Sequence, residues 1–300
     1  MPYTRPRAET PTLTATVPRQ FVHRAAVAET FLTGWRQTGT DRFAVSAQWP
    51  RAHGLHVSSD RSAYEPLLVV ETVRQSGTLI AHTEYDVPLG HHFVLQEFDV
   101  DTAPEYLEVG PAPAEPVVDV HFAEVRHRAG RPAGARYTAD VTLGGVRVAT
   151  ARVAFTCVTE SVYGRLRGGR TPATVSVPPP PSGLPPRAVG RALDADVVLA
   201  PTGRNDHWRL RIDTAHPVFF DHPLDHAPGM LLLESARQAA RVTAPGAGTP
   251  AAFRSVFHRY AELDQPVWIQ ASDENGTGVR VVATQGKSAV FECLVGMAGA

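Results

Sequence analysis

The sequence is poor in residues that form covalent cross-links, and it has no long apolar run. Its only cysteines in 300 residues, Cys157 and Cys293, cannot form a disulfide framework or a zinc site of their own. Both lie in strand-like runs, VAFTCV and AVFECLV, where a buried thiol fills space. No run approaches the roughly 18 to 20 apolar residues of a membrane span, and the segment MPYTRPRAET lacks the apolar core of a signal peptide. We therefore expect a cytoplasmic protein with no membrane partner.

An excess of charge of either sign is also absent. The chain carries 29 basic and 30 acidic residues, so no whole-chain field attracts nucleic acid or an anionic membrane. Lys287 is the only lysine, and the other basic residues are arginines, whose planar guanidinium groups suit carboxylates and phosphates. We expect no nucleic-acid partner, and an anionic substrate or carrier protein would need a local basic patch.

Several common catalytic motifs are missing. The sequence has no Gly-x-Ser-x-Gly nucleophile elbow and no Gly-x-Gly-x-x-Gly after a predicted strand. The GKS string at 286–288 lacks the upstream glycine of a P-loop. These absences speak against a serine hydrolase of that type and a nicotinamide enzyme, and we expect no cofactor.

A proline-rich stretch separates two halves. Residues 168–188 contain four consecutive prolines, Pro178 to Pro181, a composition that favours extended chain over helix or inner strand. We interpret this stretch as a linker between an N-terminal repeat, 1–167, and a C-terminal repeat, 189–300.

The two halves share an ordered pattern. Glu71, Arg74 and Gln75 recur 163 positions later as Glu234, Arg237 and Gln238, and His53 recurs as His216 at the same offset. The string VHRAAVAETFL from Val22 is similar to VGRALDADVVL from Val189. A period this long indicates duplicated domains, because solenoid repeats are far shorter.

Within each repeat the periodicity predicts one helix and several strands. FAVSAQW and WRLRID alternate like half-buried strands, whereas the run from Met230 to Arg241 is apolar nearly all round, as an enclosed helix should be. Further strand-like runs follow the helix in each half. The pattern predicts an α+β fold in which an antiparallel sheet wraps a central helix, with two such units forming an intrachain pseudo-dimer.

Charged side chains inside the predicted buried helix need an explanation. Glu234 and Arg237 share one helix face, which Gln238 extends. An unpaired charge there would cost several kcal/mol, so these side chains must pair, face a cavity or bind something. One interpretation is a structural ion pair that locks the two central helices together, and the other is a reactive site.

The loop before this helix, DHPLDHAPG, allows three interpretations. Its side chains Asp221, His222, Asp225 and His226 are metal-ligand types, although Pro223 interrupts the run. They could instead cap the helix, with Asp225 accepting from amides near the helix start. In the third interpretation, the free amides of Gly229 and Met230 bind a carbonyl oxygen as its negative charge grows.

Three longer strings resemble the A-factor synthase family, the γ-butyrolactone autoregulator synthases of streptomycetes. They are VHRAAVAETFLTGWRQTGTDRFAVSAQWPRAH, HPVFFDHPLDHAPGMLLLESARQAA and FHRYAELDQP. The resemblance implies a double hotdog fold. It also implies that a β-ketoacyl group, held as a thioester on acyl carrier protein, is joined to a hydroxyl of dihydroxyacetone phosphate. The ester then closes to a butenolide phosphate, and the family includes synthases of related butenolide and furan signals.

The same resemblance assigns catalytic roles to Glu71, Glu234 and Arg237. A glutamate desolvated in an apolar helix has a raised pKa, which suits a general base for the substrate hydroxyl. Arg237 would hold the phosphate or keep its glutamate ionised. The predicted substrate-binding residues are Arg74, Gln238, Asp221, His222, His226, Gly229, Met230 and Arg259.

Two questions stay open at this level. The first-half loop, HGLHVSSDRSAYEP, lacks the Asp-His-Pro and Pro-Gly elements of the second, so we expect one working pocket near the second helix. Glu71 would contribute to it from across the pseudo-dimer or serve as a structural mirror. The alternatives to an acyltransferase are a hotdog dehydratase or thioesterase, and a catalytically silent hotdog that binds acyl ligands.

Overall fold

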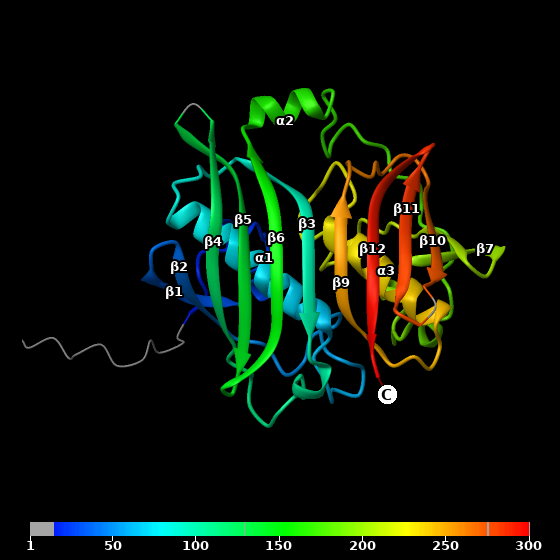
Figure 1. Cartoon of the computed structure of the whole chain (residues 1–300). Coiled ribbons are helices and arrows are strands. Elements are labelled where there is room, and N and C mark those ends of the chain that lie inside the picture. The colour runs from blue at the N-terminus through cyan, green and yellow to red at the C-terminus, as the bar shows by residue number, and fades with distance from the viewer. Residues whose placement is uncertain (1–14, 129, 275, 300) are drawn as a thin grey trace, which may run out of the picture.

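The protein folds as one antiparallel sheet with two buried helices against it (Figure 1). The computed structural model describes residues 15–128, 130–274 and 276–299. Twelve strands follow in the order β1-β2-β4-β5-β6-β3-β9-β12-β11-β10-β8-β7. The predicted α+β double hotdog is therefore confirmed in its architecture.

Each half supplies six strands. Those of the first half are β1 (Leu32–Gly39), β2 (Arg42–Ala47), β3 (His92–Thr102), β4 (Val117–Arg128), β5 (Arg131–Leu143) and β6 (Val146–Val158). Those of the second half are β7 (Leu199–Arg204), β8 (His207–Leu210), β9 (Thr249–Phe257), β10 (Val267–Asp273), β11 (Val279–Gln285) and β12 (Ser288–Ala298). Read inward from its two edges, the sheet has the same order of equivalent strands, so the halves are related by a pseudo-twofold axis.

The seam between the halves is an ordinary strand pair. β3 and β9 pair antiparallel over five residues, with Asp99 opposite Arg254 at the centre of the register. The pairing removes one exposed edge from each half, and unpaired edges are sites of unwanted association. The two repeats thus share a single continuous sheet.

The central helices, α1 (Pro66–Thr83) and α3 (Gly229–Thr243), lie on one face of the sheet (Figure 1). The predicted helix at Met230 to Arg241 is confirmed by α3. Both helices begin near a proline, which lacks the N–H that a first turn cannot satisfy. The short helix α2 (Glu160–Leu166) lies apart, beyond the end of β6.

Short 3-10 turns also repeat between the halves. Arg19–Val22 and Val27–Glu29 in the first half match Pro186–Val189 and Asp194–Asp196 in the second, and a further turn spans Pro104–Tyr106. The matched pairs are 167 positions apart, the offset found from the sequence. They carry side chains toward the polar clusters described below.

The proline-rich stretch packs against the second half. No helix or strand lies between Leu166 and Pro186, a range that the structure describes throughout. The amide of Leu184 donates to the carbonyl of Leu199, and Nε of Arg211 donates to the carbonyl of Pro181 at 3.0 Å. The first 14 residues of the proposed N-terminal repeat lie outside the described part.

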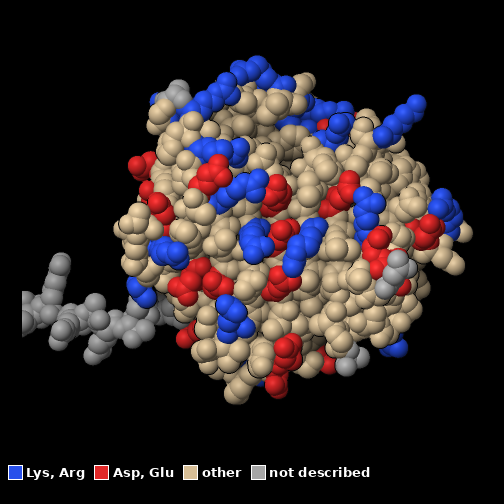
Figure 2. All heavy atoms as spheres, viewed as in Figure 1, with Lys and Arg blue, Asp and Glu red and all other residues tan. Residues whose placement is uncertain are grey.

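The outer face of the sheet carries charges of both signs side by side (Figure 2). Arg254 pairs with Asp101, and Arg136 pairs with Glu97. Both cysteines are buried, and burial raises the pKa of each thiol to about 12, which fits the space-filling interpretation. No helix in the described ranges is long and apolar enough to cross a membrane.

Candidate active site

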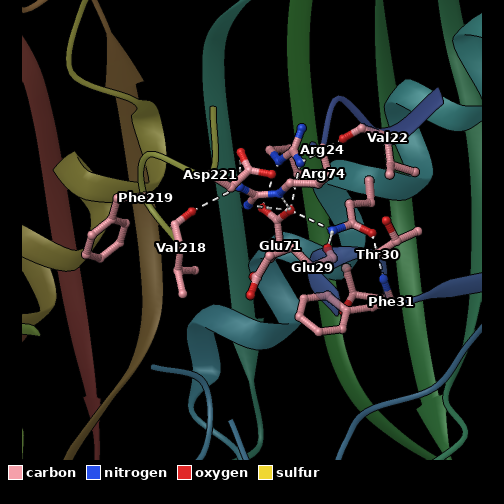
Figure 3. A network of polar contacts seen from close by, with 12 residues as sticks. Val22, Arg24, Glu29, Thr30, Phe31, Glu71, Arg74, Val218, Phe219 and Asp221 are labelled. Carbon is pink, nitrogen blue, oxygen red and sulfur yellow. Dashed lines mark hydrogen bonds and ion pairs between the residues drawn. The ribbon is translucent and has the colours of Figure 1, made fainter. Parts of the chain in front are cut away.

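A buried glutamate on α1 is held by two arginines (Figure 3). Arg74 donates to Glu71 through Nε at 2.8 Å and Nη2 at 2.7 Å, and Arg24 donates from Nε at 2.9 Å. Gln75 adds a bond of 2.7 Å from its amide nitrogen. The Glu71 side chain is fully buried, so its charge is balanced by direct pairing.

The same arrangement recurs on α3. Arg237 and Arg191 each form a two-pronged contact with Glu234, at distances of 2.7 to 2.8 Å. Gln238 donates to the same carboxylate at 2.6 Å. Arg24 and Arg191, the second arginine of each cluster, occupy corresponding positions 167 residues apart in the sequence repeat. The helix periodicity did not indicate either residue, because both lie outside the helices.

The expected raised pKa of the glutamates is wrong. Burial alone would raise the pKa of Glu234, but Arg191 and Arg237 outweigh it and hold the pKa well below its usual range. Arg24 and Arg74 do the same for Glu71. Both carboxylates therefore stay ionised and are weak bases near neutral pH.

A cavity of about 610 Å³ lies between the halves, beside the α1 cluster rather than the α3 cluster. Six of the predicted substrate-binding residues line it: Arg74, His222, His226, Gly229, Met230 and Arg259. Among the residues that the structure describes, five other predicted site residues do not line the cavity: Glu71, Glu234, Arg237, Gln238 and Asp221. The start of α3 lines the cavity, as expected for a pocket near the second helix. The charged cluster beside the cavity, however, is the one on α1.

The two helix starts differ at one equivalent position, and this difference contributes to the unequal exposure of the two clusters. Glu65 precedes α1 and lies 3.8 Å from Arg191 and 3.9 Å from Arg237. The equivalent residue before α3 is Pro228, which carries no charge and lines the cavity. Glu65 therefore lies beside both arginines of the α3 cluster, whereas the carboxylate that the second half adds to the α1 cluster, Asp221, reaches only Arg24. Arg74, whose side chain is 22% exposed, faces the cavity.

Two histidines in the wall are each held by the preceding aspartate. Nδ1 of His222 lies 2.6 Å from Asp221, and Nδ1 of His226 lies 2.7 Å from Asp225. Because an ionised carboxylate only accepts, each Nδ1 carries the hydrogen and each Nε2 is left to accept a proton. Their side chains are 39% and 23% exposed, respectively.

Asp221 links this loop to the α1 cluster. Its carboxylate accepts from the amide of Ala25 at 2.8 Å and lies 3.4 Å from Nη1 of Arg24. Burial would raise its pKa, but His222 and Arg24 lower it to about 2. A single aspartate thus orients His222 and ties the second-half loop to the first half.

Asp225 does not cap the helix. It accepts from Tyr163 at 2.6 Å and from Arg167 at 2.8 Å, and Arg167 in turn binds Glu262. The helix α3 has no side-chain cap at its start. Tyr163 and Arg167 come from the α2 region, which the sequence did not predict as part of the site.

The uncapped start of α3 lies at the wall of the cavity. The first turn of a helix has no intrahelical acceptors for its N–H groups, and those groups attract negative charge. Gly229 and Met230 line the cavity at this point. A Cβ on Gly229 would lie 3.2 Å from Phe257, so the glycine allows the wall to close tightly.

Apolar and aromatic side chains make up much of the remaining wall: Phe93, Leu95, Phe98, Val158, Leu224, Leu232, Leu233 and Phe257. His23 also lines the cavity and was missed because only its half of the repeat has a histidine there. Burial lowers the pKa of His23 to about 3, which leaves it a weak base. The cavity therefore joins an apolar compartment to a polar end near Arg74 and His222.

Comparisons with known proteins agree with this architecture. The family model "A-factor biosynthesis hotdog domain" matches residues 6–159 and 173–292. A curated "2-oxo-3-(phosphooxy)propyl 3-oxoalkanoate synthase" of Streptomyces virginiae is 49% identical over 294 residues, covering 96% of this chain and 99% of that protein. A protein of the same name from Streptomyces griseus is 40% identical and covers 92% of this chain and 93% of its own.

Solved structures show the fold alone, at low sequence identity. An acyl-ACP thioesterase from Bacteroides thetaiotaomicron aligns with a TM-score of 0.50 at 12% identity, covering 84% of this chain and 97% of that one. A putative oleoyl thioesterase from Lactobacillus plantarum aligns with a TM-score of 0.51 at 11% identity, covering 86% and 97%. With the family model matching both halves, this chain belongs to the A-factor biosynthesis hotdog domain family.

Proposed function

We propose that this protein is an acyltransferase that joins a 3-oxoacyl group, delivered as a thioester, to a hydroxyl of dihydroxyacetone phosphate. The observation that carries the proposal is the near full-length identity of 49% to a synthase named for this phosphooxypropyl ester. The geometry supports it, because one cavity offers both an apolar wall and a polar end with arginine and histidine. The product would be the ester precursor of a γ-butyrolactone-type signal.

Arg74 is the proposed phosphate-binding residue. Its Nε and Nη2 are engaged with Glu71, and Nη2 also reaches the carbonyl of Val22. Within the described ranges Nη1 has no acceptor, and the side chain faces the cavity. A guanidinium held in place by a carboxylate loses little conformational entropy on binding an anion.

His222 is the proposed general base. Its Nδ1–H is fixed on Asp221, so Nε2 can accept the proton of the substrate hydroxyl as the oxygen attacks the thioester carbonyl. The C–S bond then breaks, and the thiolate takes the proton from His222. The reaction is redox-neutral, so its electrons balance without a redox cofactor.

The amides at the start of α3 are the proposed oxyanion site. Negative charge grows on the carbonyl oxygen during the attack, and donors fixed in advance stabilise it more in the transition state than in the ground state. Gly229 and Met230 line the cavity beside Leu232 and Leu233. The acyl chain would lie along that apolar wall.

The proposed acyl donor is acyl carrier protein, as the family resemblance implies. Its phosphopantetheine arm can carry a thioester into a cavity while the carrier stays outside. The residues that line this cavity include Arg259 and Leu166, whose exposed side chains could contact such a carrier.

A product assay tests the proposal. Purified protein is incubated with a 3-oxoacyl thioester on carrier protein, with and without dihydroxyacetone phosphate, and the products are identified by mass. We expect the phosphorylated ester only when both substrates are present, and its formation should be about 100- to 10,000-fold slower with His222→Gln. Release of free acid without dihydroxyacetone phosphate would favour the thioesterase alternative. Loss of water from a 3-hydroxyacyl thioester would favour the dehydratase alternative. Binding of the thioester without turnover would favour the catalytically silent alternative.

A further inference from the structure

The cavity passes through the sheet at the seam between the halves. β3 pairs with β9 from Glu97 to Asp101, whereas the start of β3 pairs with β6 alone in the described chain, and β3 and β9 diverge toward α2 (Figure 1). Phe93 and Leu95 in this first part of β3 pack against the core, and Val94 between them points to the outer face of the sheet. All three line the cavity, so it opens on the outer face as well as beside the helices.

This passage leads to the start of α3. A Cβ on Gly229 would lie 3.6 Å from Leu95 of β3 and 3.2 Å from Phe257 of β9, which lie on the two sides of the seam. Gly229 belongs to the proposed oxyanion site. A thioester that enters from the outer face therefore reaches that site directly.

The helix α2 borders the outer opening in a fixed position. The ring of His92, at the start of β3, stacks on Tyr163 of α2 with centroids 3.6 Å apart. Arg167, directly after α2, binds Asp225 at 2.8 Å. Tyr163 and Leu166 line the cavity, and Leu166 is 60% exposed. An apolar side chain thus lies open to solvent beside the opening.

Arginines lie around this exposed leucine. Nη2 of Arg126 lies 3.3 Å from Oε1 of Gln96, which lines the cavity. Arg165 directly precedes Leu166 in α2, and Arg259 lines the cavity itself. These three arginines come from three separate segments of the chain, and all are exposed.

Positive charge is in excess at this end of the sheet. The hairpin end 124–131, α2 and the turn after β9 carry five exposed arginines: Arg126, Arg128, Arg131, Arg165 and Arg259. The two glutamates of the same segments, Glu124 and Glu160, pair with Arg136 and His92 instead. Figure 2 shows blue atoms gathered over α2 and the β4–β5 hairpin. We call the five arginines and Leu166 the basic rim.

We propose that the basic rim docks an acidic carrier protein, whose acyl thioester enters the cavity through the outer opening. This inference rests on the proposed acyl transfer, and it adds where the donor binds and from which face it enters. An apolar centre within a charged rim is typical of protein interfaces, so the partner that fits is a protein with an acidic face. Opposite charge on that face would speed the encounter and set its orientation.

Kinetics with two acyl donors test the docking surface. The same 3-oxoacyl group is supplied on acyl carrier protein and on N-acetylcysteamine, with dihydroxyacetone phosphate as the acceptor. For the double variant Arg128→Glu/Arg165→Glu we expect KM for the carrier-bound donor to rise about 10-fold or more, and kcat/KM for the small donor to stay unchanged. Among the described residues, neither arginine lines the cavity, so the acyl-transfer site is left intact.

Arg147→Glu is the matched control, because the Arg147 side chain is 67% exposed and lies near the opposite end of β6. It should leave the kinetics with both donors unchanged. Added salt should raise the wild-type KM for the carrier-bound donor alone. An equal loss with both donors, or no loss with the carrier, would overturn the proposal. A loss of the same size with a coenzyme A thioester would also overturn it, because the arginines would then bind a nucleotide.

A binding measurement separates the docking surface from the proposed reaction. Fluorescence anisotropy of labelled holo-carrier protein requires no turnover. If wild type forms no ester from the small donor but binds the carrier more tightly than Arg128→Glu/Arg165→Glu does, the proposed transfer fails and the docking surface stands. Equal affinity of the two proteins for the carrier would contradict the docking surface, whatever the assay of the product shows.

Discussion

At the scale of single residues, two ion clusters with nearly the same geometry have different surroundings. Arg74 reaches a cavity with a side chain 22% exposed, whereas the Arg237 side chain is 3% exposed and has Glu65 beside it. The chemistry of the pair therefore depends on the neighbour that crosses the seam. Arginines hold the pKa of both glutamates well below the usual range, which is why we propose a histidine as the proton-accepting group in the cavity.

Replacing His222 with glutamine should separate catalysis from binding. The amide still bonds to Asp221 but cannot accept a proton, so we expect kcat to fall about 100- to 10,000-fold with little change in KM. Steady-state kinetics with both substrates measure this. His127→Gln, at an exposed position, is the control. An unchanged kcat would assign the base to another residue.

Replacing Glu234 with glutamine should destabilise the protein. The change leaves Arg191 and Arg237 buried without their main partner, and breaking a buried pair costs about 3–5 kcal/mol. Urea unfolding followed by circular dichroism gives the difference. Glu124→Gln, where the glutamate side chain is 56% exposed, should change stability by less than about 0.5 kcal/mol.

Acid stability should depend on Asp221. Its pKa falls from 3.8 to about 2 on folding, so its contribution is fully present above pH 3.8 and is lost as the pH falls toward 2. We expect Asp221→Asn to be less stable than wild type at neutral pH and to lose less stability over that interval. Unfolding curves measured across the interval test this, and parallel losses in both proteins would contradict it.

At the scale of elements, α1 is fitted to the sheet through a glycine. A Cβ on Gly77 would overlap the ring of Tyr137, whose hydroxyl donates to the carbonyl of Val73 at 3.1 Å. The helix thus approaches β5 closely at this turn. The loop before α3 is held by hydrogen bonds instead, which Tyr163 and Arg167 donate to Asp225.

Gly77→Ala should therefore destabilise the protein, although alanine favours helices. Overpacking of a filled core costs about 1–3 kcal/mol. Gly164→Ala, in α2, meets no atom within 4 Å and should be neutral or stabilising by about 0.5–1 kcal/mol. Chemical denaturation of the two variants gives the comparison, and a stable Gly77→Ala would show that Tyr137 can move aside.

At the scale of the whole molecule, the repeats form one structural unit. They share the β3–β9 pairing, and Arg24 and Arg191 each bond to a carbonyl of the opposite half, at 3.1 and 2.7 Å. Neither charge cluster is complete without the other half. The cavity is likewise lined from both.

Thermal unfolding should accordingly occur in one cooperative transition. Because seam contacts stabilise both halves, we expect the calorimetric and van't Hoff enthalpies to agree. Differential scanning calorimetry measures both. Two resolved transitions would mean that the halves are energetically independent.

Much of the architecture could be predicted from the sequence because it depends on local periodicity. The apolar run around Glu234, its copy around Glu71 and the alternating strands predicted a duplicated α+β unit, which the structure confirms. The loop residues His222 and His226 were also placed at the site by their position before α3. The contributions of Arg24 and Tyr163 were not predicted, because each reaches the site from a distant segment.

The sequence by itself determined that each helix carries a glutamate and an arginine on one face, since that spacing is a property of the helix. Only the tertiary structure decided which cluster faces a cavity. Glu65 lies beside the two arginines of the α3 cluster, which belong to the opposite half. Pro228, at the equivalent position, carries no charge and lines the shared cavity. The physical reason is that the exposure of each arginine depends on side chains that reach it from the opposite half, and these contacts form only when the two halves pack together.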